Sequence, residues 1–273
     1  MRPGSPTTTS VTTVVFIHGA FMSAESWGPW RQRFEARGYK CVAPAWPFLD
    51  HSVGDLQRAP DPRFGKLGIT EIVDNYASII REFETPPVLV GHSFGGLLVQ
   101  NLLGRDLAAA AIAIDPAPIK GVPELPLSAL KSTSPVLGNP FNFRRAVSLT
   151  EQQFRFGFTN AVPEQEAREL YAKYAMPAPG RPLFQAATAT FNPQSATTVN
   201  VTNATRGPLL LISGAEDNTV PPVLVKSTLK AYQKSMAVTE LKEFAGRGHS
   251  LTIDSGWREI AEYILTWLHT KGL

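Results

Sequence analysis

Short apolar segments alternate with amphipathic segments along most of the chain, and this alternation restricts the fold more than any other feature. Each apolar segment is a nearly continuous hydrophobic run, as in strands that are buried on both faces. Strands that alternate with helices form a mostly parallel sheet with right-handed crossovers, because the helices cover both faces. The sequence therefore predicts an α/β fold with a sheet of about six strands, at 11–17, 39–45, 87–90, 109–114, 208–212 and 239–244.

The amphipathic segments between these strands have helical spacing. Gly38 is the expected C-cap of the first helix, and Thr70 is the expected N-cap of the second. The polar segment 48–68 has the composition of a loop. The expected helices are 26–37, 70–83, 94–104, 221–232 and 255–269.

The segment 117–206 interrupts the alternation. It is rich in proline, has no clear buried strand and contains short helical patterns such as 163–174. So long a connection in a compact domain is usually an inserted structure. We therefore expect a core domain formed by 1–116 and 207–273, and a helical cap formed by 117–206. The cap should cover the C-terminal edge of the sheet, where open α/β folds bind their ligands.

Charge and cysteine content exclude several classes of protein. Twenty-six Lys and Arg residues against 23 Asp and Glu residues give a net charge of +3 without a basic cluster, so nucleic acid is not an expected partner. The single cysteine, Cys41, excludes an internal disulfide and a thiolate metal cage. Residues 1–13 lack the apolar region of a signal peptide, and no apolar run approaches the roughly 20 residues of a membrane span. We expect a cytoplasmic protein.

A candidate nucleophile lies between an expected strand and an expected helix. Ser93 is the central residue of Gly-His-Ser-Phe-Gly, the G-x-S-x-G pattern of a nucleophile elbow. The strand must turn sharply into the helix to expose the serine hydroxyl, and Gly91 and Gly95 lack the Cβ atoms that would collide in such a turn. A glycine-rich turn with an incidental serine is the alternative interpretation.

A serine hydroxyl needs a base, and His249 is the expected one. It lies in the loop between the last strand and the last helix, where the third member of a Ser–Asp–His order belongs. The remaining histidines fit this role less well, because they lie beside the serine, in a turn, in a polar loop or near the C-terminus. They are His92, His18, His51 and His269.

Asp217 is the expected acid that orients the histidine. It follows the strand at 208–212, so its carboxylate is expected to reach the Nδ1–H of His249. Asp115, at the end of the preceding strand, is an alternative acid, and Glu216 is expected to be solvated or to brace its loop.

Two backbone amides are expected to form an oxyanion hole. Phe94, directly after the serine, offers one N–H. The loop after the first strand offers the second, most simply from Ala20, with Phe21 as the alternative. An ordinary strand-to-helix turn is the competing interpretation of this loop.

Together these motifs resemble the α/β-hydrolase superfamily. The ordered set F-I-H-G-A, G-H-S-F-G-G, S-G-A-E-D-N and G-R-G-H-S carries the resemblance, which extends from Val11 to the end of the chain. Within the superfamily the chain is similar to small capped esterases and cofactor-free perhydrolase-like enzymes. The resemblance implies the α/β-hydrolase fold with an inserted helical cap. Because only about ten residues precede the first strand, the antiparallel hairpin that usually opens the family's sheet is not expected.

These features predict a serine carboxylesterase that forms an acyl-enzyme and requires no metal or organic cofactor. A nucleophilic Ser in place of Asp argues against epoxide hydrolase and haloalkane dehalogenase chemistry. Aromatic residues of the cap favour small to medium hydrophobic esters, although the same rings are also suited to packing the cap onto the core. The candidate substrate-binding residues are Phe21, Trp46, Phe143 and Phe158.

Other activities use the same triad or the same fold. A lactonase, an amidase, a C–C hydrolase and a perhydrolase remain open, and a hydroxynitrile lyase or a slow-turnover ligand receptor is a less favoured reading. The chain is expected to be a monomer or a homodimer.

Overall fold

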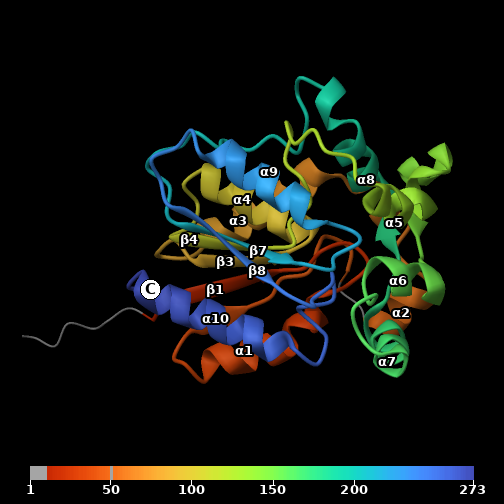
Figure 1. Ribbon diagram of the computed structural model, residues 1–273, viewed down its shortest axis with the longest axis horizontal. Helices are drawn as coiled ribbons and strands as arrows, with labels where there is room; N and C mark the ends of the chain where they lie inside the picture. Colours follow the sequence, from red (N-terminus) through yellow and green to blue (C-terminus); the bar gives the residue numbers. More distant parts are fainter. Residues whose placement is uncertain (1–10, 50–51) are drawn as a thin grey trace, which may run out of the picture.

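The computed structural model describes residues 11–49 and 52–273, and its centre is a sheet of six parallel strands (Figure 1). The Pro/Ser/Thr-rich N-terminal residues and His51 lie outside the described residues. The strand order is β2-β1-β3-β4-β7-β8. The sequence prediction of a mostly parallel, six-stranded sheet is therefore confirmed. The strands are β1 Thr13–Ile17, β2 Lys40–Val42, β3 Val88–His92, β4 Ala110–Ile114, β7 Leu209–Gly214 and β8 Thr239–Phe244.

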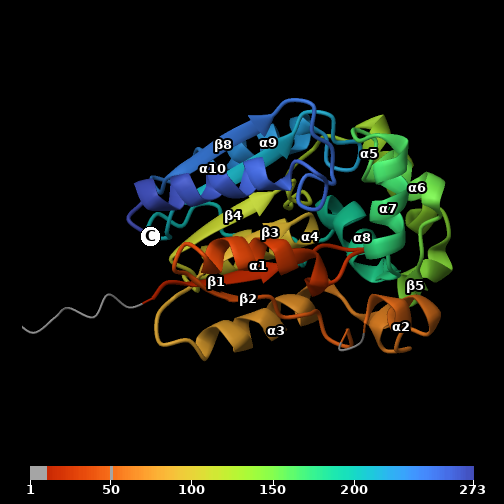
Figure 2. The same ribbon diagram turned by 90° about the horizontal axis from the view of Figure 1, so that it is seen from below.

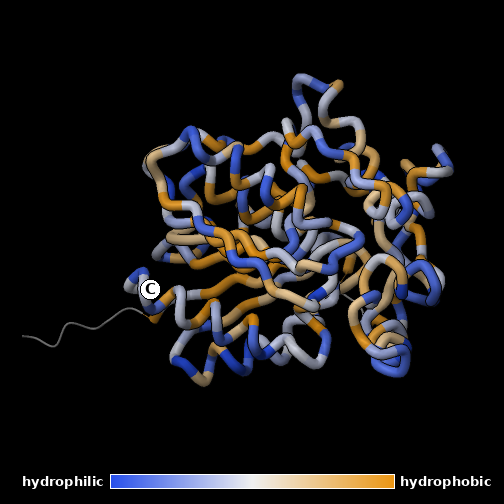
Figure 3. Tube along the Cα trace, in the orientation of Figure 1, coloured by the Kyte–Doolittle hydropathy of each residue, from blue (hydrophilic) through white to orange (hydrophobic). Residues whose placement is uncertain are grey.

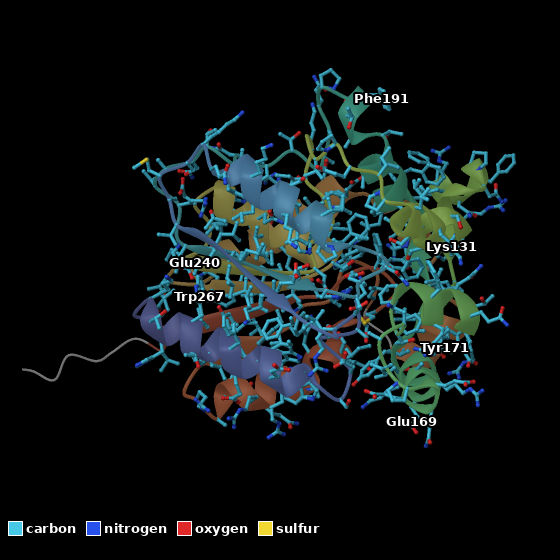
Figure 4. The ribbon with its side chains drawn as sticks, viewed as in Figure 1. Lys131, Glu169, Tyr171, Phe191, Glu240 and Trp267 are labelled. Carbon is cyan, nitrogen blue, oxygen red and sulfur yellow. The ribbon has the colours of Figure 1, made fainter. Side chains whose placement is uncertain are left out.

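The inner strands consist almost entirely of buried residues. Every residue of β1, β3, β4 and β7 is buried, as expected for strands that are covered on both faces. The edge strand β8, with the sequence TELKEF, is largely half-buried. Trp267 of the last helix donates a hydrogen bond from Nε1 to the Glu240 carboxylate of this strand, at 2.7 Å (Figure 4). The C-terminal helix is thereby fastened to the edge of the sheet.

Helices cover both faces of the sheet. The helices α1 (Gly28–Glu35) and α10 (Trp257–Thr270) pack on one face, and α3 (Ile69–Arg81), α4 (Phe94–Gly104) and α9 (Pro222–Tyr232) pack on the other (Figures 1 and 2). The apolar residues are concentrated in the sheet and on the helix faces turned toward it (Figure 3). All residues of α4 are buried, so the helix that follows Ser93 is held firmly in the core.

The residues after β4 form a separate group of helices. These helices lie beyond the C-terminal ends of the strands, on the side opposite the chain's C-terminus (Figures 1 and 2). A short antiparallel pair, β5 (Ala146–Val147) with β6 (Ala178–Pro179), joins parts of this segment, and the sequence analysis did not predict it. The helices are α5 Leu127–Leu137, α6 Glu151–Gly157, α7 Glu164–Tyr174 and α8 Gly180–Ala187.

Two local predictions were wrong. The expected loop at 48–68 contains the short helix α2 (Val53–Arg58), which begins where the Ser52 hydroxyl accepts a hydrogen bond from the backbone N–H of Asp55. The helix α3 begins at Ile69 after Gly68, so Thr70 is not its cap. The Ile69 amide donates instead to Oε1 of Gln185 in α8, at 2.8 Å, which replaces a local cap by a long-range contact.

The helix expected at 26–37 consists of two pieces. A 3₁₀ turn at Ala24–Trp27 precedes α1, which ends before Gly38. Gly38 lies just beyond the C-cap residue, Ala36, and has a φ of +91°, which glycine adopts readily. None of the helices in the described part of the chain combines the length and the apolar content that a bilayer-spanning helix requires.

Candidate active site

Three parallel strands deliver polar side chains to one edge of the sheet. Ser93 follows the end of β3, Asp217 follows the end of β7, and His249 follows the end of β8. Because all strands of the sheet are parallel, the C-terminal ends of these three open on the same side. Residues that are far apart in the sequence are thereby gathered at one site.

Ser93 occupies a strained backbone conformation between β3 and α4. Its φ is 57° and its ψ is −119°, a region that residues other than glycine rarely adopt. A Cβ atom on Gly91 would lie 2.2 Å from the carbonyl oxygen of Gly95, and one on Gly95 would lie 2.1 Å from the carbonyl oxygen of Ile17. The two glycines are therefore required by close backbone packing around the serine.

His249 and Asp217 form a completely buried pair. The Nδ1 of His249 lies 2.6 Å from Oδ2 of Asp217, and both side chains are inaccessible to solvent. Oδ1 of Asp217 accepts hydrogen bonds from the backbone N–H groups of Thr219, at 2.7 Å, and Val220, at 2.8 Å. The carboxylate thus fixes a proton on Nδ1 of His249 and leaves the lone pair on Nε2.

The Nε2 atom of His249 is the free end of this pair. It is buried and accepts no hydrogen bond from any of the described residues, the Ser93 hydroxyl included. The His249 ring lies edge-to-face against the Phe158 ring, with 4.8 Å between centroids. A neutral imidazole nitrogen with a lone pair and no partner is able to receive a proton.

His92 supports the loop that carries His249. Its ring lies 4.6 Å from the His249 ring, and its Nε2 lies 2.9 Å from the backbone carbonyl oxygen of His249. Burial lowers the pKa of His92 well below its ordinary value, with a further decrease from the neighbouring His249. We therefore assign a neutral ring to His92, with Nε2–H donating to the carbonyl.

The loop after β1 passes directly over the serine. A Cβ atom on Gly19 would lie 2.7 Å from Cβ of Ser93 and 2.9 Å from the carbonyl oxygen of His92. The buried backbone amides of Ala20 and Phe94 donate to no acceptor among residues 11–49 and 52–273. Buried amides normally have partners, so these two unpartnered N–H groups are available to donate to an oxygen bound beside the serine.

His18 braces this loop. Its Nδ1 lies 2.8 Å from the carbonyl oxygen of Gly19, and its Nε2 accepts a hydrogen bond of 3.2 Å from the backbone N–H of Trp46. The His18 and Trp46 rings are stacked, with 4.9 Å between centroids. Burial lowers the pKa of His18 to about 4, so the ring is neutral around pH 7.

An apolar cavity of about 170 Å³ begins at Ser93 and extends under the helices that follow β4. Phe21 and Phe158, two of the candidate substrate-binding residues, line it. The other two candidates, Phe143 and Trp46, are not among the lining residues: the Phe143 ring is 41% exposed and packs on Phe184, and Trp46 stacks on His18. No sequence pattern indicated the lining from α5 and α8, which is Ala129, Leu130, Ser132, Thr133, Leu137, Leu183, Ala186 and Ala187.

Nitrogen and oxygen atoms of His92, Asp115 and His249 lie within 4.8 Å of one another, which is close enough to hold a metal ion. The rings have other contacts, however. His92 Nε2 lies against the His249 carbonyl oxygen, and His249 Nδ1 lies against Asp217. We therefore assign the three residues to the hydrogen-bond network around the histidine–aspartate pair.

Comparison with known proteins places this geometry in context. The model of the alpha/beta hydrolase family matches residues 14–263. The comparison with curated protein sequences found no match.

Three solved structures share the fold at low sequence identity. The monoacylglycerol lipase of Paleococcus ferrophilus is 22% identical, with a TM-score of 0.65 over 94% of this chain and 93% of the lipase. An extracellular α/β-hydrolase from a Paenibacillus species is 19% identical, with a TM-score of 0.66 over 93% and 98% of the two chains. A methylesterase from Arabidopsis is 20% identical, with a TM-score of 0.62 over 95% and 100%.

Proposed function

The chain belongs to the alpha/beta hydrolase family, and we propose that it is a serine hydrolase that cleaves small to medium hydrophobic carboxylic esters. The observation that carries this proposal is the buried His249–Asp217 pair. Nε2 of His249 has no partner among the described residues, and it lies at the same sheet edge as the strained Ser93. The names of the fold neighbours, a lipase and a methylesterase among them, agree with ester chemistry.

In the first half of the reaction, Ser93 is acylated. Nε2 of His249 takes the proton from the Ser93 hydroxyl as the oxygen attacks the ester carbonyl carbon, and Asp217 stabilises the resulting imidazolium. The carbonyl oxygen becomes an oxyanion that accepts hydrogen bonds from the amides of Ala20 and Phe94. When the intermediate collapses, the C–O bond to the alcohol breaks and His249 returns the proton to the leaving oxygen.

The second half repeats these steps with water. His249 removes a proton from a water molecule, whose oxygen attacks the acyl carbon of the Ser93 ester. The same two amides hold the oxyanion, and collapse releases the carboxylic acid while the proton returns to the Ser93 oxygen. Each cycle therefore consumes one ester and one water and leaves the enzyme unchanged.

We also propose that residues 117–206 act as the cap that selects the substrate. The cavity at Ser93 is closed on one side by α5 and α8 of this segment, whose contributed side chains are mainly apolar. Burial of each additional methylene contributes about 0.8 kcal/mol, so kcat/KM should rise about fourfold per methylene until the cavity is full. A volume of about 170 Å³ limits this increase to short and medium acyl chains.

The test is a series of p-nitrophenyl esters of increasing acyl length, together with labelling by a serine-directed phosphonate. We expect hydrolysis that passes through a maximum at medium length, and one phosphonyl adduct on Ser93 by intact mass and peptide mapping. Ser93→Ala should abolish both. Ser78→Ala should change neither, because the Ser78 hydroxyl lies on the outer side of α3 and bonds only to the carbonyl of Asp74.

Full esterase turnover by Ser93→Ala would overturn the proposed mechanism. Slow turnover of every ester with rapid turnover of amides, lactones or peroxide-dependent substrates would replace the substrate class while retaining the nucleophile.

A further inference from the structure

A second buried carboxyl group, that of Asp115, lies behind the His249–Asp217 pair. Asp115 follows the last residue of β4, and its backbone N–H donates to the carbonyl oxygen of Ile212 at 2.9 Å. Its side chain is completely buried, and Oδ1 accepts a hydrogen bond of 2.7 Å from the backbone N–H of Gly214 at the end of β7. Asp115 therefore continues β4 and is held by two hydrogen bonds to β7.

The Asp115 carboxyl lies close to the His249–Asp217 pair: one of its oxygens is within 4.8 Å of a ring nitrogen of His249, and Nδ1 of the same ring lies 2.6 Å from Oδ2 of Asp217. Oδ2 of Asp115 has no donor among the described residues, although it is inaccessible to solvent. Asp115 also has a φ of 41°, which makes it one of three strained residues at this site, with Phe21 and Ser93.

Two adjacent buried carboxyl groups cannot both carry a negative charge, so one proton is shared between them. Asp217 accepts two backbone N–H bonds and contacts Nδ1 of His249, whereas Asp115 accepts one N–H bond from Gly214. The charge is better stabilised on Asp217. Burial, followed by the neighbouring Asp217, raises the pKa of Asp115 well above its ordinary value.

We propose that Asp115 is a positioning residue: its carboxyl is neutral and donates a hydrogen bond from Oδ2 to the Asp217 carboxylate. This contact holds Asp217 in the orientation that faces His249 and keeps a single negative charge behind the histidine. The titratable groups that face Asp115 are Asp217, His249, His92 and, more distantly, Asp254. The inference deepens the proposed function, since it assigns a role within the same site.

The variants Asp115→Asn and Asp115→Ala distinguish whether the Asp115 carboxyl acts as a neutral hydrogen-bond donor or as an ionised acid. Asn has the shape of the protonated carboxyl: its oxygen accepts from Gly214 N–H and its NH₂ group donates to Asp217. We expect Asp115→Ala to lower kcat about tenfold to a hundredfold with KM little changed, because Asp115 does not line the cavity. Asp115→Asn should restore kcat to within about fivefold of the wild-type value, whereas Asp217→Asn should not.

Thermal unfolding gives a readout that does not depend on activity. The folded chain retains the Asp115 proton that the unfolded chain releases, so the wild type loses stability as pH rises above the ordinary Asp value. Asp115→Asn does not titrate. Its melting temperature relative to the wild type should therefore rise between pH 4 and pH 8, by at least about 3 °C.

Three outcomes would overturn the inference. Loss of activity in Asp115→Asn equal to that in Asp217→Asn would make Asp115 the ionised acid. Full activity in Asp115→Ala would show that the hydrogen bond to Asp217 has no effect, and a melting difference that is independent of pH would contradict the neutral carboxyl. Failure of the proposed function is distinguishable, because absent phosphonate labelling of Ser93 would leave the melting difference of Asp115→Asn intact.

Discussion

Acidification should destabilise the protein through His18, the ring that braces the loop over Ser93. The folded chain holds His18 with a pKa of about 4, because burial disfavours the charged ring, whereas the value in the unfolded chain is the ordinary 6.5. Between these two values the unfolded state binds more protons than the folded state. The free energy of unfolding must therefore decrease as pH falls from 6.5 toward 4.

The size of this effect follows from the pKa difference. A difference of about 2.5 pH units corresponds to about 3.4 kcal/mol in total. Relative to pH 7, the loss attributable to His18 should be about 2 kcal/mol at pH 5 and about 3 kcal/mol at pH 4. A loss of this size is a considerable part of the net stability of most domains, which is about 5–15 kcal/mol.

The assay compares urea unfolding of the wild type with that of His18→Gln between pH 7 and pH 4. Gln does not titrate, and its side-chain oxygen is able to accept from the Trp46 amide, as Nε2 of His18 does. The difference in unfolding free energy between the two proteins cancels the other titrating groups, His92 included. We expect this difference to shift by about 3 kcal/mol over the range, in favour of Gln at low pH. Parallel curves for the two proteins would refute a buried, neutral His18.

Three further substitutions test the site. Gly19→Ala should lower kcat at least about a hundredfold, because the new Cβ would lie 2.7 Å from Cβ of Ser93. Gly28→Ala is the matched control and should keep the wild-type kcat, because its new Cβ would meet no described atom within 4 Å. Asp217→Asn should lower kcat by about 10⁴-fold, because the amide no longer fixes the proton on Nδ1 of His249. Circular dichroism should show that the fold is retained. A loss of less than tenfold would contradict the proposed role of Asp217. Phe158→Ala should raise KM for medium-chain esters more than for acetate esters, because the Phe158 ring lines the cavity. Equal changes of KM for both esters in steady-state kinetics would exclude a contact between this ring and the acyl chain.

The positions of the inner strands were predictable, because each strand has a recognisable sequence pattern of its own. β3, β4 and β7 are continuous apolar runs between turn residues, and each was predicted to within two residues at either end. The start of α3 was predicted to within one residue, but its cap was not predictable, because its first amide donates to Gln185, which is more than a hundred residues away. The pair β5–β6 has two residues in each strand, too few for a periodic pattern.

The candidate site was likewise predictable only in part. Ser93, Asp217 and His249 lie at the ends of strands, and parallel topology alone brings such positions to one edge; their catalytic roles stay predictions. Asp115 was identified from the same reasoning as an alternative acid, but its position beside the His249–Asp217 pair depends on the register between β4 and β7, which no short motif encodes. The cavity lining depends on which face of α5 and α8 turns inward, and apolar residues occur on more than one face of α5.

The proposed chemistry and the proposed substrate choice therefore rest on different parts of the chain. Ser93, Asp115, Asp217 and His249 follow four neighbouring strands of the sheet, of which β3, β4 and β7 are fully buried and tolerate little change in geometry. The far wall of the cavity comes from helices between β4 and β7, where Leu125 and Leu127 remain largely exposed. Substitutions in these helices leave the strand ends in place, so they are expected to change which ester binds without changing how the bond is broken.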